Sequence, residues 1–243
     1  MDPLLATAAR RVREARHVCV LTGAGISAES GIPTFRDALT GLWSRFRPEE
    51  LATPEAFERN PVLVWEWYEA RRAQVLKTAP NAGHRALATL AQRIPRLTLV
   101  TQNVDGLHQR AGSTGVLEYH GNILRDRCVD EQVVRERAAN VTGLPRCAAC
   151  GAMLRPDVVW FGEGIPIEPM RRADAAAREC DVFLSVGTSS LVYPAAGLAE
   201  IALRRGATVV EVNPNPTDLS PLADVVLRGP SGVVLPQLLA AML

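Results

Sequence analysis

One histidine of this 243-residue sequence stands in a setting that suits proton transfer. In Tyr119-His120-Gly121, the imidazole has an ordinary pKa close enough to neutrality to accept a proton from a hydroxyl group at physiological pH. A lone histidine is more often structural than catalytic, so this motif alone has little weight. His17, His84 and His108 serve as internal comparisons, and we assign them no chemistry.

A glycine-rich turn, Gly23-Ala24-Gly25-Ile26-Ser27-Ala28, follows the first apolar stretch. It matches G-x-G-x-x-G/A, in which glycines let the backbone turn tightly and approach a pyrophosphate near a helix N-terminus. Alone this is a weak signal, because such a turn often has no ligand. The acidic residue that a dehydrogenase carries about 20 residues further on is missing. Gly31-Ile32-Pro33-Thr34-Phe35-Arg36-Asp37 follows instead, so an ordinary dehydrogenase is not expected.

Polar residues gather after three other apolar stretches: Thr101-Gln102-Asn103-Val104-Asp105, Gly187-Thr188-Ser189-Ser190 and Asn213-Pro214-Asn215. In open α/β sheets, ligands bind outside the carboxyl ends of the strands. Backbone amides and small hydroxyl groups there suit phosphate and ribose oxygens. The alternative is that each segment is only a turn, since asparagine, aspartate and glycine are common turn residues.

Three of the five cysteines form a candidate zinc module. Cys128 and Cys147-Ala148-Ala149-Cys150 nearly fit the pattern C-x₂-C-x₁₅₋₂₀-C-x₂-C. Glu131 stands where the remaining cysteine belongs, and the spacing is kept although the ligand type changes. Zinc accepts carboxylate oxygen, while structural sites favour sulfur and imidazole. We expect zinc at Cys128, Glu131, Cys147 and Cys150, the alternative being a site that has lost its metal.

The elements that must position these residues alternate between apolar strands and alanine-rich helices. The predicted strands are His17–Leu21, Leu97–Thr101, Asp181–Val186, Thr208–Val212 and Asp224–Leu227. Predicted helices include Arg171–Glu179 and Pro194–Arg204. Continuous apolar strands separated by helices indicate a parallel sheet that is covered on both faces. The expected fold is therefore α/β, with a doubly wound, Rossmann-like lobe.

Two stretches interrupt the alternation and are expected to pair as a smaller lobe. Residues 39–80 are predicted to be helical and rich in aromatics, and residues 125–153 hold the cysteine module. The sequence thus predicts a single domain over 1–243. Its Rossmann-like lobe comprises about 1–38, 81–124 and 154–243, and its small lobe about 39–80 and 125–153.

Composition narrows the class of partner and the compartment. With 27 basic and 26 acidic residues the net charge is +1, so the composition does not indicate a basic surface for binding nucleic acid or an anionic membrane. No apolar run approaches the roughly 18 residues of a membrane span. The arginine-rich stretch Met1–Arg16 is expected to be a first helix rather than a transit peptide. An odd number of cysteines, with Cys19 and Cys180 in apolar strand-like runs, favours a reducing, cytoplasmic location.

Taken together, the motifs resemble the sirtuin family, the NAD-dependent protein deacylases. The resemblance covers nearly the whole chain and rests on Gly23–Ser27, Gly31–Arg36, Gln102–Asp105, His120-Gly121, the cysteine module, Phe161-Gly162-Glu163, Gly187–Ser189 and Asn213–Asn215. Any one of these would be weak, whereas all of them in family order leave very little room for chance.

The resemblance implies a reaction that consumes NAD as a cosubstrate. The carbonyl oxygen of an acylated lysine attacks the ribose carbon and expels nicotinamide. His120 then takes a proton from a ribose hydroxyl, whose oxygen attacks the amide carbon. Water finishes the reaction, and the products are free lysine and O-acyl-ADP-ribose. Asn103 is the second residue implied in catalysis.

The resemblance also implies which residues contact NAD and the acylated protein or peptide. The implied NAD-binding residues are Gly23, Ala24, Gly25, Ser27, Glu29, Phe35, Arg36, Gln102, Asn103, Val104, Asp105, Gly187, Thr188, Ser189, Asn213, Pro214, Asn215 and Ser231. The peptide would lie extended beside Val159 and Phe161 and pair through backbone hydrogen bonds.

One pair of residues narrows the acyl group. Tyr68 and Arg71 fall three apart on a predicted helix from about Asn60 to Lys77, so both can face one ligand. Sirtuins that prefer succinyl, malonyl or glutaryl lysine carry this pair, which implies a desuccinylase or demalonylase that also deacetylates. The alternative is that Tyr68 only packs and Arg71 is a solvated charge. Two other functions stay open: ADP-ribosyl transfer to protein, and a non-catalytic NAD sensor.

Overall fold

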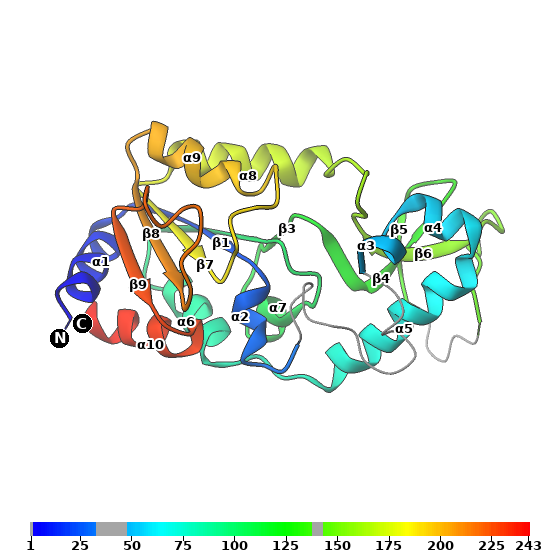
Figure 1. Ribbon diagram of the computed structural model, residues 1–243, viewed down its shortest axis with the longest axis horizontal. Helices are drawn as coiled ribbons and strands as arrows, with labels where there is room; N and C mark the ends of the chain where they lie inside the picture. Colours follow the sequence, from blue (N-terminus) through cyan, green and yellow to red (C-terminus); the bar gives the residue numbers. More distant parts are fainter. Residues whose placement is uncertain (1, 33–47, 138–142) are drawn as a thin grey trace.

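A six-stranded parallel sheet lies at the centre of the larger part of the molecule, between its helices (Figure 1). The computed structural model describes residues 2–32, 48–137 and 143–243. In spatial order the strands are β3 (Leu117–Glu118), β2 (Arg96–Thr101), β1 (His17–Thr22), β7 (Val182–Val186), β8 (Thr208–Asn213) and β9 (Val225–Arg228). All neighbouring strands pair in parallel. The five predicted strands are confirmed, and β3 adds a short edge strand.

Helices cover both faces of this sheet, which confirms the doubly wound fold (Figure 1). One face packs against α1 (Pro3–Glu14), α6 (Ala82–Ala91) and α10 (Ser231–Ala241), and the other against α8 (Ile167–Glu179) and α9 (Gly197–Arg204). Consecutive residues of a strand point to opposite faces, so strands buried on both sides must be apolar throughout. Every residue of β1 and β7 is buried.

The remaining helices include the predicted helical insertion. It contains α3 (Pro48–Leu51), α4 (Pro54–Arg59) and α5 (Pro61–Lys77). Thr53 and Asn60 cap α4 and α5 by accepting hydrogen bonds from the backbone, and a proline begins each helix. The expected helix from about residue 60 to 77 is confirmed, and it buries Trp65, Trp67 and Tyr68.

A second, three-stranded antiparallel sheet carries the cysteines. It consists of β4 (Gly121–Cys128), β5 (Val134–Glu136) and β6 (Leu154–Val158), with β4 in the centre. These strands were not predicted, and the sheet reaches beyond the expected 125–153 segment at both ends. Charged residues such as Arg125 and Asp126 hide the strand pattern, because ion pairs rather than apolar contacts accompany their burial.

Arg72 joins the helical insertion to this second sheet. Its guanidinium lies 2.5 Å from Asp126 of β4 and 2.6 Å from Glu69 of its own helix. It also stacks 4.7 Å from the ring of Trp65 and donates to the main-chain oxygen of Ile123. Because Arg72 and Asp126 are both buried, replacing either one would leave the other as an unpaired charge in the interior.

Two short helices, α2 (Ala24–Ala28) and α7 (Leu107–Arg110), follow β1 and β2 at the carboxyl edge of the large sheet. None of the helices in the described part of the chain combines the length and the apolarity that a membrane crossing demands.

Candidate active site

The polar segments that follow the apolar strands meet at one edge of the large sheet. β2, β1, β7 and β8 are consecutive neighbours, and their carboxyl ends lead into the segments around Gln102, Gly23, Gly187 and Asn213. The chain passes from β1 to β2 on one side, whereas β7 lies on the other side of β1. Such a change of direction is the topological switch point at which doubly wound sheets bind nucleotides.

Glycines allow the backbones of two of these segments to touch. The amide of Gly25 donates to the oxygen of Gly187 at 2.7 Å. A Cβ atom on Gly25 would lie 2.7 Å from the Cα and oxygen of Gly187, which no side chain tolerates. The site therefore offers backbone groups at the point where β1 and β7 end, as the glycine motif predicts for a phosphate neighbour.

Side-chain hydrogen bonds tie three of the strand ends together. The amide of Gln102 donates to the hydroxyl of Thr188 at 3.0 Å, and that of Asn213 donates to the Thr188 carbonyl at 2.9 Å. The backbone of Asn215 donates to the Asn213 side chain at 3.1 Å. Ser189 is half-buried beside them, whereas Pro214 and Asn215 are exposed. The predicted residues of β2, β7 and β8 thus form one connected surface.

A buried polar cluster lies behind the Gly23–Ser27 turn. The hydroxyl of Ser27 donates to Asp105 at 2.7 Å, and the amide of Asn103 lies 2.9 Å from the Gly23 carbonyl and 3.1 Å from Ser27. Burial raises the pKa of Asp105, while hydrogen bonds from the backbone of Leu107 and from Ser27 oppose that rise. The cluster fixes the half-buried Asn103 amide at this edge of the sheet.

His120 follows edge strand β3 and turns back toward β2. Its Nδ1 lies 3.0 Å from the main-chain oxygen of Gln102. A carbonyl only accepts hydrogen bonds, so Nδ1 carries the proton and Nε2 of the neutral ring keeps its lone pair. Burial lowers the pKa of His120, and the hydrogen bond to Gln102 partly offsets this. The side chain is half-buried and suited to accept a proton through Nε2.

The residue after His120 must be glycine. Gly121 has φ of +83°, and a Cβ atom there would lie 2.1 Å from the main-chain oxygen of Asp157. The amide of Val159 donates to the carbonyl of His120 at 2.9 Å. β6 and the segment that follows it therefore hold the backbone on both sides of the imidazole.

The predicted peptide-binding segment is anchored by the buried Trp160. Val159 is half-buried, and Phe161 is 46% exposed while its amide donates to the Ala52 carbonyl at 2.9 Å. The guanidinium of Arg155 lies 3.4 Å from the centre of the Trp160 ring. The hydrogen bond to Ala52 and the buried neighbour Trp160 hold Phe161 at the surface.

Tyr68 and Arg71 lie against the same tryptophan-rich core. The indole nitrogen of Trp160 donates to the Tyr68 hydroxyl at 2.9 Å, and burial raises the pKa of Tyr68 to about 12. The Arg71 guanidinium lies 4.9 Å from the centre of the Trp67 ring. Burial lowers the pKa of Arg71, against the effect of Tyr68. The helix thus brings Tyr68 into contact with Trp160, in the segment that follows β6, with Arg71 one turn further along.

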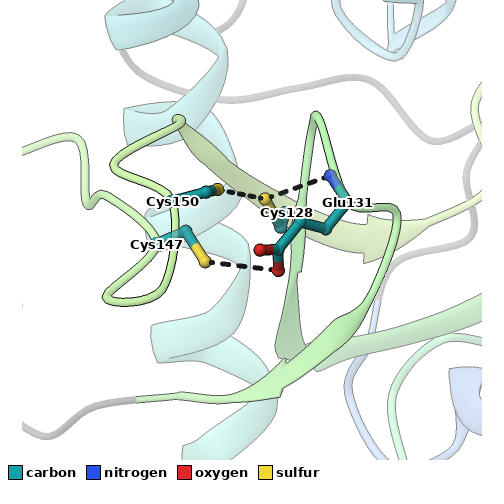
Figure 2. A group of neighbouring side chains, drawn as sticks. All are labelled: Cys128, Glu131, Cys147 and Cys150. Carbon is teal, nitrogen blue, oxygen red and sulfur yellow. Dashed lines mark hydrogen bonds between the residues drawn. The ribbon is translucent and has the colours of Figure 1, made fainter.

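The cysteine module brings its four predicted ligands together (Figure 2). The ligand atoms of Cys128, Glu131, Cys147 and Cys150 all lie within 4.8 Å of one another. The sulfurs of Cys128 and Cys150 are 3.4 Å apart, and Cys147 lies 3.8 Å from a Glu131 oxygen. Zinc–sulfur bonds of about 2.3 Å in a tetrahedron place ligands about 3.8 Å apart. The donor set therefore fits a zinc ion in both geometry and chemistry.

Comparison with known proteins decides the family. The Sir2 family model matches residues 23–194, which is most of the chain. The chain belongs to the Sir2 family. A relative from Ralstonia nicotianae, named as an NAD-dependent protein deacylase, is 56% identical over 230 residues, covering 94% of this chain and 93% of the relative.

Solved Sir2 structures have the same fold. A Sir2 homologue in complex with NAD is 43% identical, with a TM-score of 0.92 over 100% of this chain and 94% of the homologue. A Sir2 protein bound to an acetylated peptide is 28% identical, with a TM-score of 0.87 over 99% of this chain and 98% of that protein. Family membership confirms the resemblance seen in the sequence.

Other predicted NAD residues of this Sir2 chain lie at the start of α10 or outside the described residues. Phe35 and Arg36, expected at NAD, lie outside the described residues. Glu29 and Ser231 are brought together at the start of α10, where Glu29 accepts from the Ser231 hydroxyl at 3.2 Å and from the Gly232 amide at 2.7 Å.

Two histidines of the Sir2 site were not assigned from the sequence. His84 lies 3.4 Å from the Ser27 hydroxyl, and His108 lies 2.9 Å from the Thr22 hydroxyl, with the two rings 4.9 Å apart. Burial lowers the pKa of His84 to about 4 and that of His108 to about 3, so both rings are neutral near pH 7. The one feature of the sequence that could have indicated a histidine at this site is the position of His108, three residues after Asp105.

Proposed function

We propose that this chain is an NAD-dependent protein lysine deacylase in which His120 is the general base. The orientation of His120 carries the proposal, because the Gln102 carbonyl leaves Nε2 unprotonated beside the glycine-rich nucleotide edge. Family membership, a deacylase relative at 56% identity and similarity to a homologue in complex with NAD support it.

Different residues at the carboxyl edge of the large sheet bind different parts of NAD. Gly23, Ala24, Gly25 and Gly187–Ser189 contact the phosphates, and Asn213–Asn215 with Ser231 and Glu29 line the adenosine end. Ser27 and Gln102–Asp105 line the nicotinamide ribose, whereas the assignment of Phe35 and Arg36 to NAD rests on the family resemblance alone, because both lie outside the described residues. The tie between Gln102 and Thr188 supports this arrangement, because it links the phosphate and nicotinamide segments.

NAD supplies an activated ribose carbon with nicotinamide as the leaving group. Asn103 holds the nicotinamide end, and the acyl-lysine carbonyl oxygen is the nucleophile. Nε2 of His120 accepts the proton of a ribose hydroxyl, so that its oxygen can attack the carbon of the acyl group. The lysine amine then leaves the acyl carbon and water adds to it, so the products are nicotinamide, deacylated lysine and O-acyl-ADP-ribose.

The protein substrate binds as an extended peptide beside Val159 and Phe161. A solved Sir2 protein of the same fold binds an acetylated peptide, which supports acylated proteins as substrates. Free, buried Cys19 and Cys180 support a reducing, cytoplasmic setting. The division into a Rossmann-like lobe and a small lobe accords with the separate cores of the two sheets.

The acyl group preferred by this enzyme is a dicarboxylic one, succinyl or malonyl, with acetyl as a poorer substrate. A neutral acetyl group has no use for a guanidinium, whereas a carboxylate at the end of the acyl chain can pair with Arg71. The Tyr68 hydroxyl stays protonated because its pKa is about 12, so it can donate a further hydrogen bond. The closeness of Tyr68 to Trp160 supports a position beside the acylated peptide.

A panel of acetyl, succinyl and malonyl peptides tests the activity and the preference together. Mass spectrometry should show NAD-dependent loss of the acyl mass, whereas a gain of ADP-ribose on the peptide would indicate transferase activity instead. Arg71→Met should lower kcat/KM for the succinyl peptide by about one to two decades, the effect of a charge-assisted hydrogen bond. Acetyl turnover should change little.

Lys77→Met, at the exposed end of the same helix, is the matched control and should leave both rates unchanged. Equal losses on acetyl and succinyl peptides in Arg71→Met would mean that Arg71 supports the fold, and the acyl preference would be wrong.

A further inference from the structure

Glu211 is a buried carboxylate in the large sheet that the deacylation chemistry does not use. It lies in β8, where its neighbours in register are Ser185 of β7 and Val226 of β9. Only 1% of its side chain is exposed. Burial of an ionised carboxylate is unfavourable unless the group is paired and hydrogen-bonded, so its partners are informative.

The partners of Glu211 come from the loop between β8 and β9. The Ser220 hydroxyl donates to one carboxylate oxygen at 2.5 Å, and the Thr217 hydroxyl donates to the other. The Thr217 amide in turn donates to Ser220 at 2.9 Å. Arg228, at the end of β9, lies 3.3 Å from Glu211. The carboxylate thus holds the loop folded back against its own strand.

Arg228 extends this network to the turn at the candidate nucleotide edge. Nη1 donates to the Asn215 carbonyl at 2.8 Å, and Nη2 donates to Ser220 at 2.8 Å. Arg228 also lies opposite Asn213 in the pairing of β8 with β9. Arg228, paired with Glu211, therefore holds the main chain of Asn213–Asn215. The strands that carry these residues, β8 and the edge strand β9, are the orange strands of Figure 1.

We propose that Glu211 and Arg228 are positioning residues for NAD. They hold the Asn213–Asn215 turn in the shape that receives the adenosine ribose, and they touch neither the peptide nor the reacting atoms. The inference rests on the proposed function, which assigns this turn to NAD. A turn that is already ordered loses less conformational freedom when the ligand binds, so the pair raises affinity for the ADP-ribose part of NAD.

Two variants separate this role from catalysis. Glu211→Gln keeps the shape of the side chain and removes its charge, while Arg228→Met removes the guanidinium from a side chain that is 38% exposed. In both, we expect the Kd of ADP-ribose, measured by calorimetry, and the KM for NAD to rise about tenfold, as for loss of a charged hydrogen bond. The kcat at saturating NAD and the KM for the acyl peptide should stay within about twofold.

Arg178→Met is the matched control, because it removes an exposed ion pair with Asp174 on α8, outside this network. It should leave the affinity for ADP-ribose unchanged. Should Glu211→Gln fail to fold, Arg228→Met decides the question alone. An unchanged Kd for ADP-ribose in a folded Arg228→Met protein overturns this inference only, as does a fall in kcat without a rise in KM. A wild-type protein that neither binds ADP-ribose nor consumes NAD would refute the proposed function as well.

Discussion

At the scale of single residues, the main chain of Gln102 decides which nitrogen of His120 is basic. Its carbonyl accepts the proton of Nδ1 at 3.0 Å and leaves the Nε2 lone pair available. An imidazole without such a partner exchanges between tautomers, and only one of them could serve as the base. The geometry therefore leaves Nε2 of His120 free to accept a proton, as the proposed general base requires.

Replacing the imidazole should abolish catalysis without unfolding the protein. His120→Ala should lower NAD-dependent deacylation at least 10²–10⁴-fold, roughly the contribution of general base catalysis. Nicotinamide release with an acetylated peptide measures the activity, and circular dichroism with ADP-ribose binding checks the fold. A folded variant that keeps more than a few per cent of the wild-type rate would remove His120 from the mechanism.

The lowered pKa of His120 also fixes the direction of the pH profile. A general base works only when it is unprotonated, so kcat/KM should be level at neutral pH and fall as the solution becomes more acidic than the His120 pKa. Because burial puts that pKa below the ordinary value of 6.5, the midpoint of the fall should lie below pH 6.5. An acetyl peptide is the right substrate, since its acyl group does not titrate. A midpoint above pH 6.5 would point to another group.

At the scale of elements, the antiparallel sheet depends on the cysteine module at its end. Cys128 ends β4, and Cys147 and Cys150 lie in the segment that leads to β6. Two buried thiols, Cys128 and Cys147, with the exposed Cys150 and one carboxylate leave few apolar contacts to hold these segments together. Zinc, when bound, would join them, and its contribution would be to folding, because His120 lies outside the module.

Elemental analysis of protein purified without chelator tests the metal site. We expect about one zinc per chain, with faster loss of zinc to a chromogenic chelator in Glu131→Ala. Glu131→Cys should retain zinc at least as well as the wild type, since thiolate is the commoner structural ligand. Asp130→Ala, which changes the exposed neighbouring carboxylate, is the control. Retention that is equal in Glu131→Ala and in Asp130→Ala would exclude Glu131 as a ligand.

At the scale of the whole molecule, two buried histidines connect the nucleotide edge to the packing of the large sheet. His84 belongs to α6 and His108 to α7, and they contact Ser27 and Thr22 respectively. Both are neutral in the folded protein because burial lowers their pKa values to about 4 and about 3. In the unfolded chain each would titrate near the ordinary value of 6.5.

Stability should therefore fall as the solution is acidified below pH 6.5. Between pH 6.5 and about 4 the unfolded chain binds more protons than the folded one, so the free energy of unfolding decreases with falling pH. At pH 5 each histidine should cost about 2 kcal/mol relative to neutral pH. Urea unfolding at pH 7.5 and pH 5 measures the loss, which should shrink in a His84→Gln/His108→Gln variant. An unchanged pH dependence in that variant would show that other groups are responsible.

The local pattern of apolar and polar residues in the sequence was sufficient to predict the large sheet and the location of the candidate site. β1, β2, β7, β8 and β9 are mainly apolar runs, and a buried parallel strand requires little else. The polar segments after them were predictable as a site, because parallel strands bring their carboxyl ends to one edge. The helix α5, with Tyr68 and Arg71 three residues apart on it, was also predicted.

Only the tertiary structure decided what depends on partners far away in the chain. β4 was missed because Asp126 is buried through Arg72, a residue on a different element. The tautomer of His120 depends on Gln102, and the role of Glu211 depends on Arg228. Hydrophobic periodicity is a local property of a strand or helix, whereas the pairing of buried charges and the direction of a proton depend on contacts that form only when the chain has folded.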